Sequence, residues 1–590
     1  MQVRDGKACR LINFGRYMYF KSAPEKGRFF WSAKMTQNAA TSFEIPPPSP
    51  TGVPYARLWL ALACVVIYGK FLNNPLIFDD MHSVQTDKFL NAYSWMFDFT
   101  LRWFSYATFS WTHKLFGTNI SWHRIINLAL HMAVVFSLYA LLQRIFKAVL
   151  TNDSEEWQSS ARIAFWGALI FAVHPVAVYA TGYLIERSIV MATLFSILTL
   201  ICFLRGLLGE GWKWFFFAGL CYFLAVFSKE HAVMLPFALM AMVLLLRGGG
   251  IVNFRKLIIP FIGYIAIALL ITMKTKGMLG AAYEPNVAGV IAGLSRESAN
   301  VTDANVHQLS ILLQCYGFFK YLLFWLLPYV GWMSIDLQQK FPTGLLQWPE
   351  TLGLVVFCAY PFIVVHLLRQ GGKKGLLGFA LLFPWLMFFT EFVAIRIVES
   401  LVLYRSYLWM ACLPLALPMV MGKTNVKTRD DLIMAAIVCV LTVSAWNRLN
   451  TFSDNIALWG DVIDTLPDIK SQNLYRPYLN RGTYKFLQDR DGEAISDFNK
   501  ALEYDPNNAT VYASRGGSKA KLGMKLEAYH DFNRAIELDP KNALAYQNRG
   551  LVQVEMGNYE QGLADINKAF ELDPTSPIIQ RTLAAVRALK

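Results

Sequence analysis

Residues 184–204 read LIERSIVMATLFSILTLICFL, an apolar run in which one acid and one base, Glu186 and Arg187, stand side by side near the start. A helix needs about 20 apolar residues to cross the hydrocarbon core of a bilayer. The run therefore predicts a membrane-spanning helix with two charged side chains at one end. Runs of this kind recur as far as Trp446, and they decide the fold class.

The recurring apolar runs predict an all-α, polytopic membrane domain over residues 57–446. The 590-residue chain is 55% hydrophobic and only 16% charged, a composition that few soluble proteins share. A further run at 311–327 either crosses the bilayer or does not, so we expect about 11–12 spans. The predicted spans lie near 57–72, 122–142, 161–181, 184–204, 213–228, 231–246, 257–273, 351–368, 376–395, 401–421 and 431–446.

The basic residues predict the topology of this domain. The net charge is +14, which in a soluble protein would suggest a nucleic-acid partner. Here Lys and Arg gather in alternate loops, as the positive-inside rule describes for cytoplasmic loops, so we expect membrane lipids rather than nucleic acid as partners. With eleven spans, the basic tail 1–56 is cytoplasmic and residues 447–590 are extracytoplasmic. The host membrane is then a bacterial inner membrane, or the endoplasmic reticulum in a eukaryote.

The eight cysteines do not indicate a disulfide framework. Most of them fall inside the apolar runs, and no two have the CxxC spacing of a thiolate metal site.

Residues 447–590 carry an internal repeat. Pro506, Pro540 and Pro574 are spaced by 34 residues, and Gly482, Gly516 and Gly550 share this period. A 34-residue period with paired amphipathic helices is typical of tetratricopeptide repeats. We expect three repeats over roughly 475–575 and a closing helix, forming an α-solenoid that binds a protein. The alternative is an array that only caps the membrane domain.

The predicted topology places acids and bases together on the extracytoplasmic side. Charged groups are costly inside a membrane and mark functional sites there. Snorkelling side chains that anchor helix ends would explain any one of them, but less well a rim of mixed sign. The candidate residues are Asp79, Asp80, Arg102, His174, Glu186, Arg187, Lys229, Glu230, Glu399 and Arg405.

Asp79 and Asp80 directly follow the first predicted span. A carboxylate there could take a proton from an acceptor hydroxyl while a lipid-held donor stays in the bilayer. Cationic side chains on the same rim could hold a leaving phosphate. These requirements fit inverting transfer of a sugar from a polyprenyl-phosphate donor. The carboxylate pair could also hold a divalent cation, Mg²⁺ or Mn²⁺, against that phosphate.

Several short motifs, in their order along the chain, carry a family resemblance. They are Phe78-Asp79-Asp80, the segments 101–106 and 122–131, Phe171-Ala172-Val173-His174-Pro175, Glu186-Arg187 and Ser228-Lys229-Glu230. Over roughly 70–590 the chain resembles the multispanning, tetratricopeptide-bearing O-mannosyltransferases and their bacterial relatives, which are glycosyltransferases of the GT-C superfamily.

The resemblance implies a polyprenyl-phosphate-linked monosaccharide donor and a catalytic acid in the first outer loop, Asp79 or Asp80. It suggests Arg102, Arg187, Lys229 and Arg405 as ligands of the donor phosphate. His174, Glu186, Glu230 and Glu399 are supporting residues in this interpretation.

Two outer segments, 73–121 and 274–350, complete the predicted site, the second as a lid or as an interfacial support. The sugar and the class of acceptor stay open, with a protein recruited by the repeats as our expectation. Two alternatives remain: a non-catalytic membrane scaffold for envelope protein assembly, and a ligase for a larger lipid-linked glycan.

Overall fold

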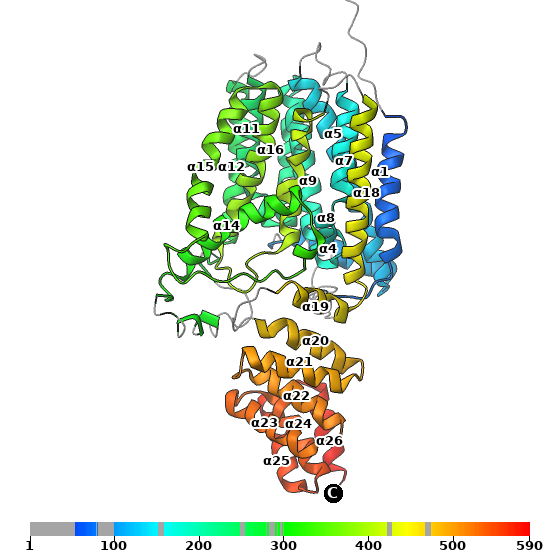
Figure 1. Ribbon diagram of the computed structural model, residues 1–590, viewed down its shortest axis with the longest axis vertical. Coiled ribbons are helices and arrows are strands. Elements are labelled where there is room, and N and C mark those ends of the chain that lie inside the picture. Colours follow the sequence, from blue (N-terminus) through cyan, green and yellow to red (C-terminus); the bar gives the residue numbers. More distant parts are fainter. Residues whose placement is uncertain are drawn as a thin grey trace, which may run out of the picture. The chain divides into compact units, whose positions relative to one another are not determined.

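The fold is helical throughout the part of the chain that the structure, a computed structural model, describes (Figure 1). The described residues contain no strand, and Leu337 and Leu401 form an isolated β-bridge. The prediction of an all-α class is therefore confirmed. The described residues are 53–77, 80, 100–150, 159–247, 254–278, 280–281, 290–291, 293–295, 298, 300–421, 427–466 and 474–589, which leaves out Asp79 and nearly all of the basic tail 1–56.

Long apolar helices form the membrane domain. Seven described segments are long and apolar enough to cross a bilayer, and the bent pair α7 (Ser160–Val173) and α8 (Pro175–Thr181) would make an eighth. The run at 311–327, left open by the sequence, belongs to one of the seven. The seven contain α5 (Ile120–Val149), α9 (Arg187–Leu207), α12 (Ile258–Lys274), α14 (Val306–Leu326), α15 (Glu350–Arg369), α16 (Gly372–Phe388) and α18 (Lys427–Thr451).

The remaining predicted spans are helical but short. They are α1 (Ala56–Tyr68), α10 (Lys213–Ser228) and α11 (Leu235–Arg247), together with a broken stretch at 403–419. That stretch consists of η7 (Leu403–Arg405), α17 (Ser406–Trp409) and η8 (Met410–Met419). All eleven predicted runs are thus helical, while the number of membrane crossings stays a prediction.

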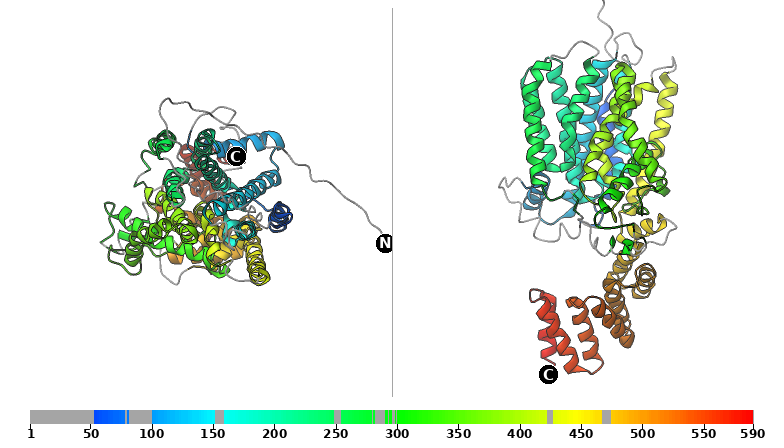
Figure 2. Two further views of the ribbon diagram at one scale, coloured as in Figure 1. Left: turned by 90° about the horizontal axis from the view of Figure 1, so that it is seen from above. Right: turned by 90° about the vertical axis from the view of Figure 1, so that its left-hand side faces the viewer.

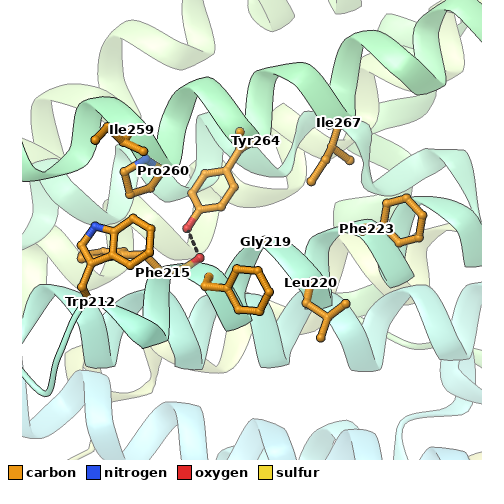
Figure 3. A pocket seen from close by; sticks show the side chains of 11 residues that line it. Trp212, Phe215, Gly219, Leu220, Phe223, Ile259, Pro260, Tyr264 and Ile267 are labelled. Atoms are coloured by element: carbon orange, nitrogen blue, oxygen red, sulfur yellow. Dashed lines mark hydrogen bonds between the residues drawn. The ribbon is translucent and has the colours of Figure 1, made fainter.

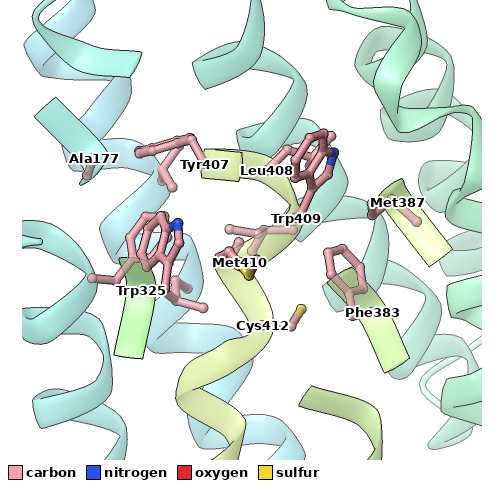
Figure 4. Close-up of a cluster of buried hydrophobic side chains, with 14 of the residues drawn as sticks. Ala177, Trp325, Phe383, Met387, Tyr407, Leu408, Trp409, Met410 and Cys412 are labelled. Atoms are coloured by element: carbon pink, nitrogen blue, oxygen red, sulfur yellow. The ribbon is translucent and has the colours of Figure 1, made fainter. Parts of the chain in front are cut away.

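The broken stretch is buried in a cluster of large side chains (Figure 4). Tyr407 and Trp409 are fully buried, and the Trp409 ring packs edge-on against Tyr321 at a centroid distance of 5.1 Å. The indole N–H of Trp325 donates to Ser406 Oγ over 2.9 Å, which satisfies a polar group inside the cluster. This packing fixes the backbone immediately after Arg405.

Small residues bring the membrane helices close together. A Cβ on Gly353 of α15 would lie 2.7 Å from Cα of Tyr316 on α14, so only glycine fits at this crossing. Such close backbone approach is a main source of helix association in membranes.

The predicted lid segment 274–350 packs against the loop that follows α16. Its residues Val301, Leu309 and Leu313 form one apolar cluster with Ile397 and Val398. The segment therefore contacts the part of the chain between Arg396 and Glu399.

The C-terminal region is a stack of paired antiparallel helices (Figures 1 and 2). One charged interaction recurs with the sequence period: Arg481–Asp497, Arg515–Asp531 and Arg549–Asp565 are each bidentate, with N–O distances between 2.6 and 3.0 Å. The helices are α20 (Tyr475–Leu487), α21 (Asp491–Tyr504), α22 (Ala509–Lys521), α23 (Lys525–Leu538), α24 (Ala543–Glu555), α25 (Tyr559–Leu572) and the closing α26 (Pro577–Arg587).

We expect Gly550→Ala to destabilise the last helix pair by about 1–3 kcal/mol, because the added methyl group would overpack the contact. A Cβ on Gly550 would lie 2.6 Å from the carbonyl oxygen of Gly562, which is backbone and cannot rotate away. Gly492→Ala is the matched control, since a Cβ there meets nothing within 4 Å. Amide hydrogen exchange in α24 and α25 should accelerate in the first variant alone. Equal exchange in both variants would contradict the claim that the contact between α24 and α25 requires glycine at position 550.

Candidate functional site

In the sequence, Asp80 comes after α1 and before α4 (Trp103–Phe116), and it is fully buried. Its two carboxylate oxygens accept hydrogen bonds from the backbone N–H groups of Leu184 (3.2 Å) and Ile185 (2.8 Å). Burial raises the pKa of Asp80 to about 7, although Arg124 and the backbone donors act in the opposite direction. A carboxylate with this pKa suits general-base chemistry near neutral pH. Asp79 lies outside the described residues.

Arg124 on α5 bonds to two separate segments of the chain: the one that leads to Asp80, and the one that precedes the backbone donors of Asp80. It donates to the carbonyls of Asn74 (3.0 Å), Pro75 (2.5 Å) and Gly182 (2.9 Å). The segment that leads to Asp80 is thereby tied to the turn before Leu184. In the sequence Arg124 stood out only as part of a motif, and its role as a clamp was missed.

Arg102 and Glu230 form a bidentate ion pair. Nε and Nη2 of Arg102 donate to Oε2 and Oε1 of Glu230 over 2.9 and 2.5 Å. Arg102 is the residue before α4 and has a positive φ of 59°, a strained conformation that is often found at functional sites. The Glu230 carboxylate raises the pKa of Arg102 well above its ordinary value.

Lys229 and Glu186 form a second pair in the same region. Lys229 Nζ donates to Glu186 Oε2 over 2.5 Å, and both side chains are buried. Lys229 Nζ also lies 5.0 Å from the ring centroid of Tyr404, and the Arg405 guanidinium lies 5.8 Å from the same ring. One aromatic ring thus neighbours two of the predicted phosphate ligands.

Glu391 joins these groups and was not among the predicted site residues. It is fully buried, it accepts from Arg405 Nη1 over 2.9 Å, and its other oxygen lies 3.0 Å from His231 Nε2. Arg396 Nε lies 3.8 Å from the same carboxylate. An acid within the apolar run 376–395 was the available signal, because buried charges in membrane helices are rarely without a role.

Glu399 extends this arrangement. Its carboxylate lies 3.6 Å from Arg405 Nη2 and accepts from Arg476 Nη2 over 3.3 Å. Burial alone would raise the pKa of Glu399, but Arg476 and Arg405 lower it overall.

The charged network gathers residues from distant parts of the sequence. We use this name for Arg102, Glu186, Lys229, Glu230, His231, Glu391, Glu399 and Arg405. Six of these eight were predicted site residues. Arg102 has the most exposed side chain of the ion pairs described above, at 34%, whereas Glu391 and Arg405 are at 0% and 4%. The network therefore runs from an accessible guanidinium to a fully buried acid.

Two predicted site residues lie in other surroundings. Arg187 donates to Asn127 (2.7 Å), to the carbonyl of His123 (2.9 Å) and to two threonine hydroxyls, and it is fully buried between α4, α5 and α9. His174 accepts from the N–H of Val176 and so caps α8, at a bend of 61° after α7.

Within the described ranges, no three or more His, Cys, Asp or Glu side chains are grouped to hold a metal ion. The predicted cation would sit between Asp79 and Asp80, and Asp79 is not among those ranges. Metal binding therefore stays a prediction.

The comparisons with known families identify the repeats. Residues 475–508 and 532–564 each match a model described as the tetratricopeptide repeat. The repeats predicted from the 34-residue period are thus confirmed. Among solved structures, the Arabidopsis OM64 TPR domain is 22% identical in sequence, with a TM-score of 0.20. The match covers 20% of this chain and 98% of that domain.

Part of the chain is similar to curated proteins. A stretch of 131 residues, 21% of the chain, is 31% identical to Protein O-mannosyl-transferase TMTC2 of Mus musculus. The protein of the same name from Homo sapiens is 30% identical over 131 residues. The match covers 14% of the length of each of these relatives.

Proposed function

We propose that this chain is a membrane glycosyltransferase of the GT-C type that moves one monosaccharide from a polyprenyl-phosphate donor to an acceptor hydroxyl. The observation that carries the proposal is the charged network, which unites six separately predicted residues. The partial similarity to an O-mannosyl-transferase supports a sugar as the transferred group. The apolar helices support a lipid-held donor, because a donor in the bilayer can reach a site at the end of membrane helices.

In the proposed reaction, Asp80 or Asp79 removes the proton from the acceptor hydroxyl as that oxygen attacks the anomeric carbon. The new bond joins the acceptor oxygen to the anomeric carbon, and the bond between that carbon and the phosphate oxygen breaks. Polyprenyl phosphate leaves with the electron pair, and direct displacement inverts the configuration of the sugar. The burial of Asp80 supports this role, since a pKa near 7 leaves the base partly ionised at neutral pH.

The cations of the network would stabilise the charge that develops on the leaving phosphate. Arginine is suited to this task because its planar guanidinium can contact two phosphate oxygens at once. Arg102 is our first candidate because its side chain is the most accessible. Lys229 and Arg405 lie deeper, and each has at least one carboxylate partner that compensates its charge before the donor enters.

The proposed site faces the extracytoplasmic side, either of a bacterial inner membrane or of the endoplasmic reticulum. The tetratricopeptide repeats would recruit a protein acceptor on that side, because such arrays bind peptides and proteins on their surface.

We expect Arg102→Ala to lower kcat/KM for the lipid donor by about 10- to 100-fold, the loss that follows from removing a hydrogen bond to a charged group. Arg205→Ala is the matched control. Arg205 also forms an ion pair, with Glu210 at 2.5 Å, but it lies in the last turn of α9, at the end of that helix opposite Arg187. Transfer from a radiolabelled polyprenyl-phosphate sugar measures both. Equal rates in the two variants would show that Arg102 does not contact the donor.

A further inference from the structure

The loop that leads into α15 carries three highly exposed apolar side chains. Residues 341–349 read FPTGLLQWP, and they contain no charged residue. Leu345, Leu346 and Trp348 are 56%, 93% and 75% exposed on the surface of the protein. We call these three side chains the apolar tip. Large apolar side chains that are exposed as a group mark a surface that binds a partner or a membrane.

Hydrogen bonds fix the loop in the conformation that presents the apolar tip. The side-chain oxygen of Gln347 accepts from the backbone N–H of Thr343 over 2.8 Å. The hydroxyl of Thr351, in the first turn of α15, lies 3.0 and 2.8 Å from the carbonyl oxygens of Leu345 and Gln347 and donates to them. The exposure of the tip is therefore built into the loop, so little further ordering is needed when a partner binds.

The apolar tip continues the lipid-facing surface of α15. Only 22% of the apolar stretch of this helix is buried within the protein. Leu352 and Val355, in its first two turns, are 44% and 59% exposed. A helix that spans the membrane places its first turns at the boundary between the hydrocarbon core and the headgroups. Because the tip precedes these turns by only a few residues, it lies at that boundary.

The charges on either side of the loop suit a phospholipid surface. Glu350, the acid that follows the apolar tip in the sequence, is only 6% exposed, so its carboxylate does not face outward. Lys340, at the other end of the loop, is exposed. Tryptophan is enriched at the level of lipid headgroups, where lysine side chains also anchor membrane proteins. The outward surface of the loop thus presents apolar and cationic groups without an acid.

The loop is held at the end of the membrane domain where the charged network lies. Phe341, at the start of the loop, is 5% exposed and belongs to the apolar cluster that contains Val398. On α15, the ring centroid of Phe357 lies 5.5 Å from that of Phe392, which follows Glu391 in the sequence. The loop therefore connects the membrane surface with the segment that packs beside the network.

We propose that the apolar tip inserts into the headgroup region of the bilayer and anchors the segment 274–350 to the membrane surface. The partner is a phospholipid surface, which the three apolar side chains and the cation of Lys340 recognise. A soluble protein is a poorer fit, because it would have to cover a tip that lies at the edge of the bilayer. The inference goes beyond sugar transfer, since it requires neither a donor nor an acceptor.

Hydroxyl-radical labelling in lipid nanodiscs tests the proposal on the unmodified protein. Leu346 is compared with Leu526, a residue of the same type in α23 of the repeats that is 60% exposed. By its exposure on the protein surface alone, Leu346 would be labelled faster. We expect it to be labelled about tenfold more slowly than Leu526, because lipid excludes the water from which the radicals form. Equal or faster labelling of Leu346 would overturn the proposal.

A photoreactive phenylalanine analogue in place of Leu346 identifies what covers the apolar tip. The full-length chain is purified and reconstituted into liposomes of phosphatidylcholine and phosphatidylglycerol. Leu220 lines an apolar groove between α10 and α12 and is 47% exposed, so the analogue at position 220 gives the yield for a lipid-facing position (Figure 3). The analogue at position 526 gives the yield for a position in water. We expect a lipid adduct at position 346, as at position 220, and none at position 526.

Two results of the crosslinking would overturn the proposal. One is a crosslink from position 346 to a second copy of the chain in place of lipid. The other is a yield of lipid adduct as low as at position 526. Neither measurement depends on catalysis. If sugar transfer is not found and the lipid adduct forms at position 346, the proposed function fails and the membrane anchor stands.

Discussion

Replacing Asp80 with asparagine should lower sugar transfer by about 10²- to 10⁴-fold, the contribution that a positioned general base makes. The amide cannot accept the acceptor proton. Its NH₂ group would also face one of the backbone donors at Leu184 and Ile185, which now bond to the carboxylate. Transfer from a lipid-phosphate sugar, measured on purified protein of verified melting temperature, gives the result.

Two variants serve as controls for this prediction. Asp431→Asn alters a carboxylate that accepts from Arg162 and Trp166, away from the charged network, and should retain wild-type transfer. Asp79→Asn decides between the two neighbours. Loss of transfer in Asp79→Asn with a normal rate in Asp80→Asn assigns the base to Asp79. Normal rates in both variants would exclude the pair as the base.

The pH dependence follows from the same carboxylate. As a base, Asp80 must be ionised, so the wild-type rate should fall as the pH falls through about 7. The stability of the folded protein changes with pH in the opposite direction to the rate, because the folded state holds the Asp80 proton more tightly than the unfolded state does. The pKa of Asp80 is raised from 3.8 in the unfolded chain to about 7 in the folded protein. The stabilisation that comes from binding this proton is therefore complete below about pH 4 and is lost as the pH rises through about 7. Asp80→Asn should abolish this part of the pH dependence of melting.

Glu391→Ala should destabilise the folded protein by about 3–5 kcal/mol, the typical loss when one partner of a buried ion pair is removed. Glu391 is fully buried and compensates Arg405 directly, with His231 and Arg396 beside it. Without it, Arg405 and His231 lose their common acceptor while both side chains stay buried. Thermal unfolding in detergent, followed by circular dichroism, measures the loss.

Glu399→Ala is the matched control for Glu391→Ala. Glu399 also pairs with Arg405, but its side chain is 22% exposed, so water can replace part of the lost interaction. Glu399→Ala should therefore lower the free energy of unfolding clearly less than Glu391→Ala does. An equal cost in the two variants would mean that Glu391 does not organise the network.

The sequence predicted the helical class, the repeats and most members of the charged network, since each depends on local pattern. Apolar run length defines a membrane helix, and a 34-residue period defines the repeat. The ion pairs could not be predicted, because they join residues such as Arg102 and Glu230 that are 128 positions apart. Glu391 was overlooked because a single acid does not interrupt an apolar run.

Neighbours in sequence also proved to have different surroundings. Glu186 and Arg187 are adjacent in the sequence, yet Glu186 contacts Lys229 whereas Arg187 contacts Asn127. Successive residues in a helix point about 100° apart, so adjacent side chains reach different neighbours. His174 precedes Pro175 and caps a helix, an arrangement that the proline at the first helical position already indicates.

The central claim is that this chain transfers a sugar from a lipid phosphate to a protein, and intact-mass analysis tests it whatever the sugar and the acceptor protein are. Secreted and membrane-associated proteins are compared between cells with the wild-type chain and cells with the Asp79→Asn, Asp80→Asn double variant. We predict at least one protein that is heavier by whole monosaccharide residues only with the wild-type chain. Identical masses in both cells, with the variant present at normal level in the membrane, would contradict the claim.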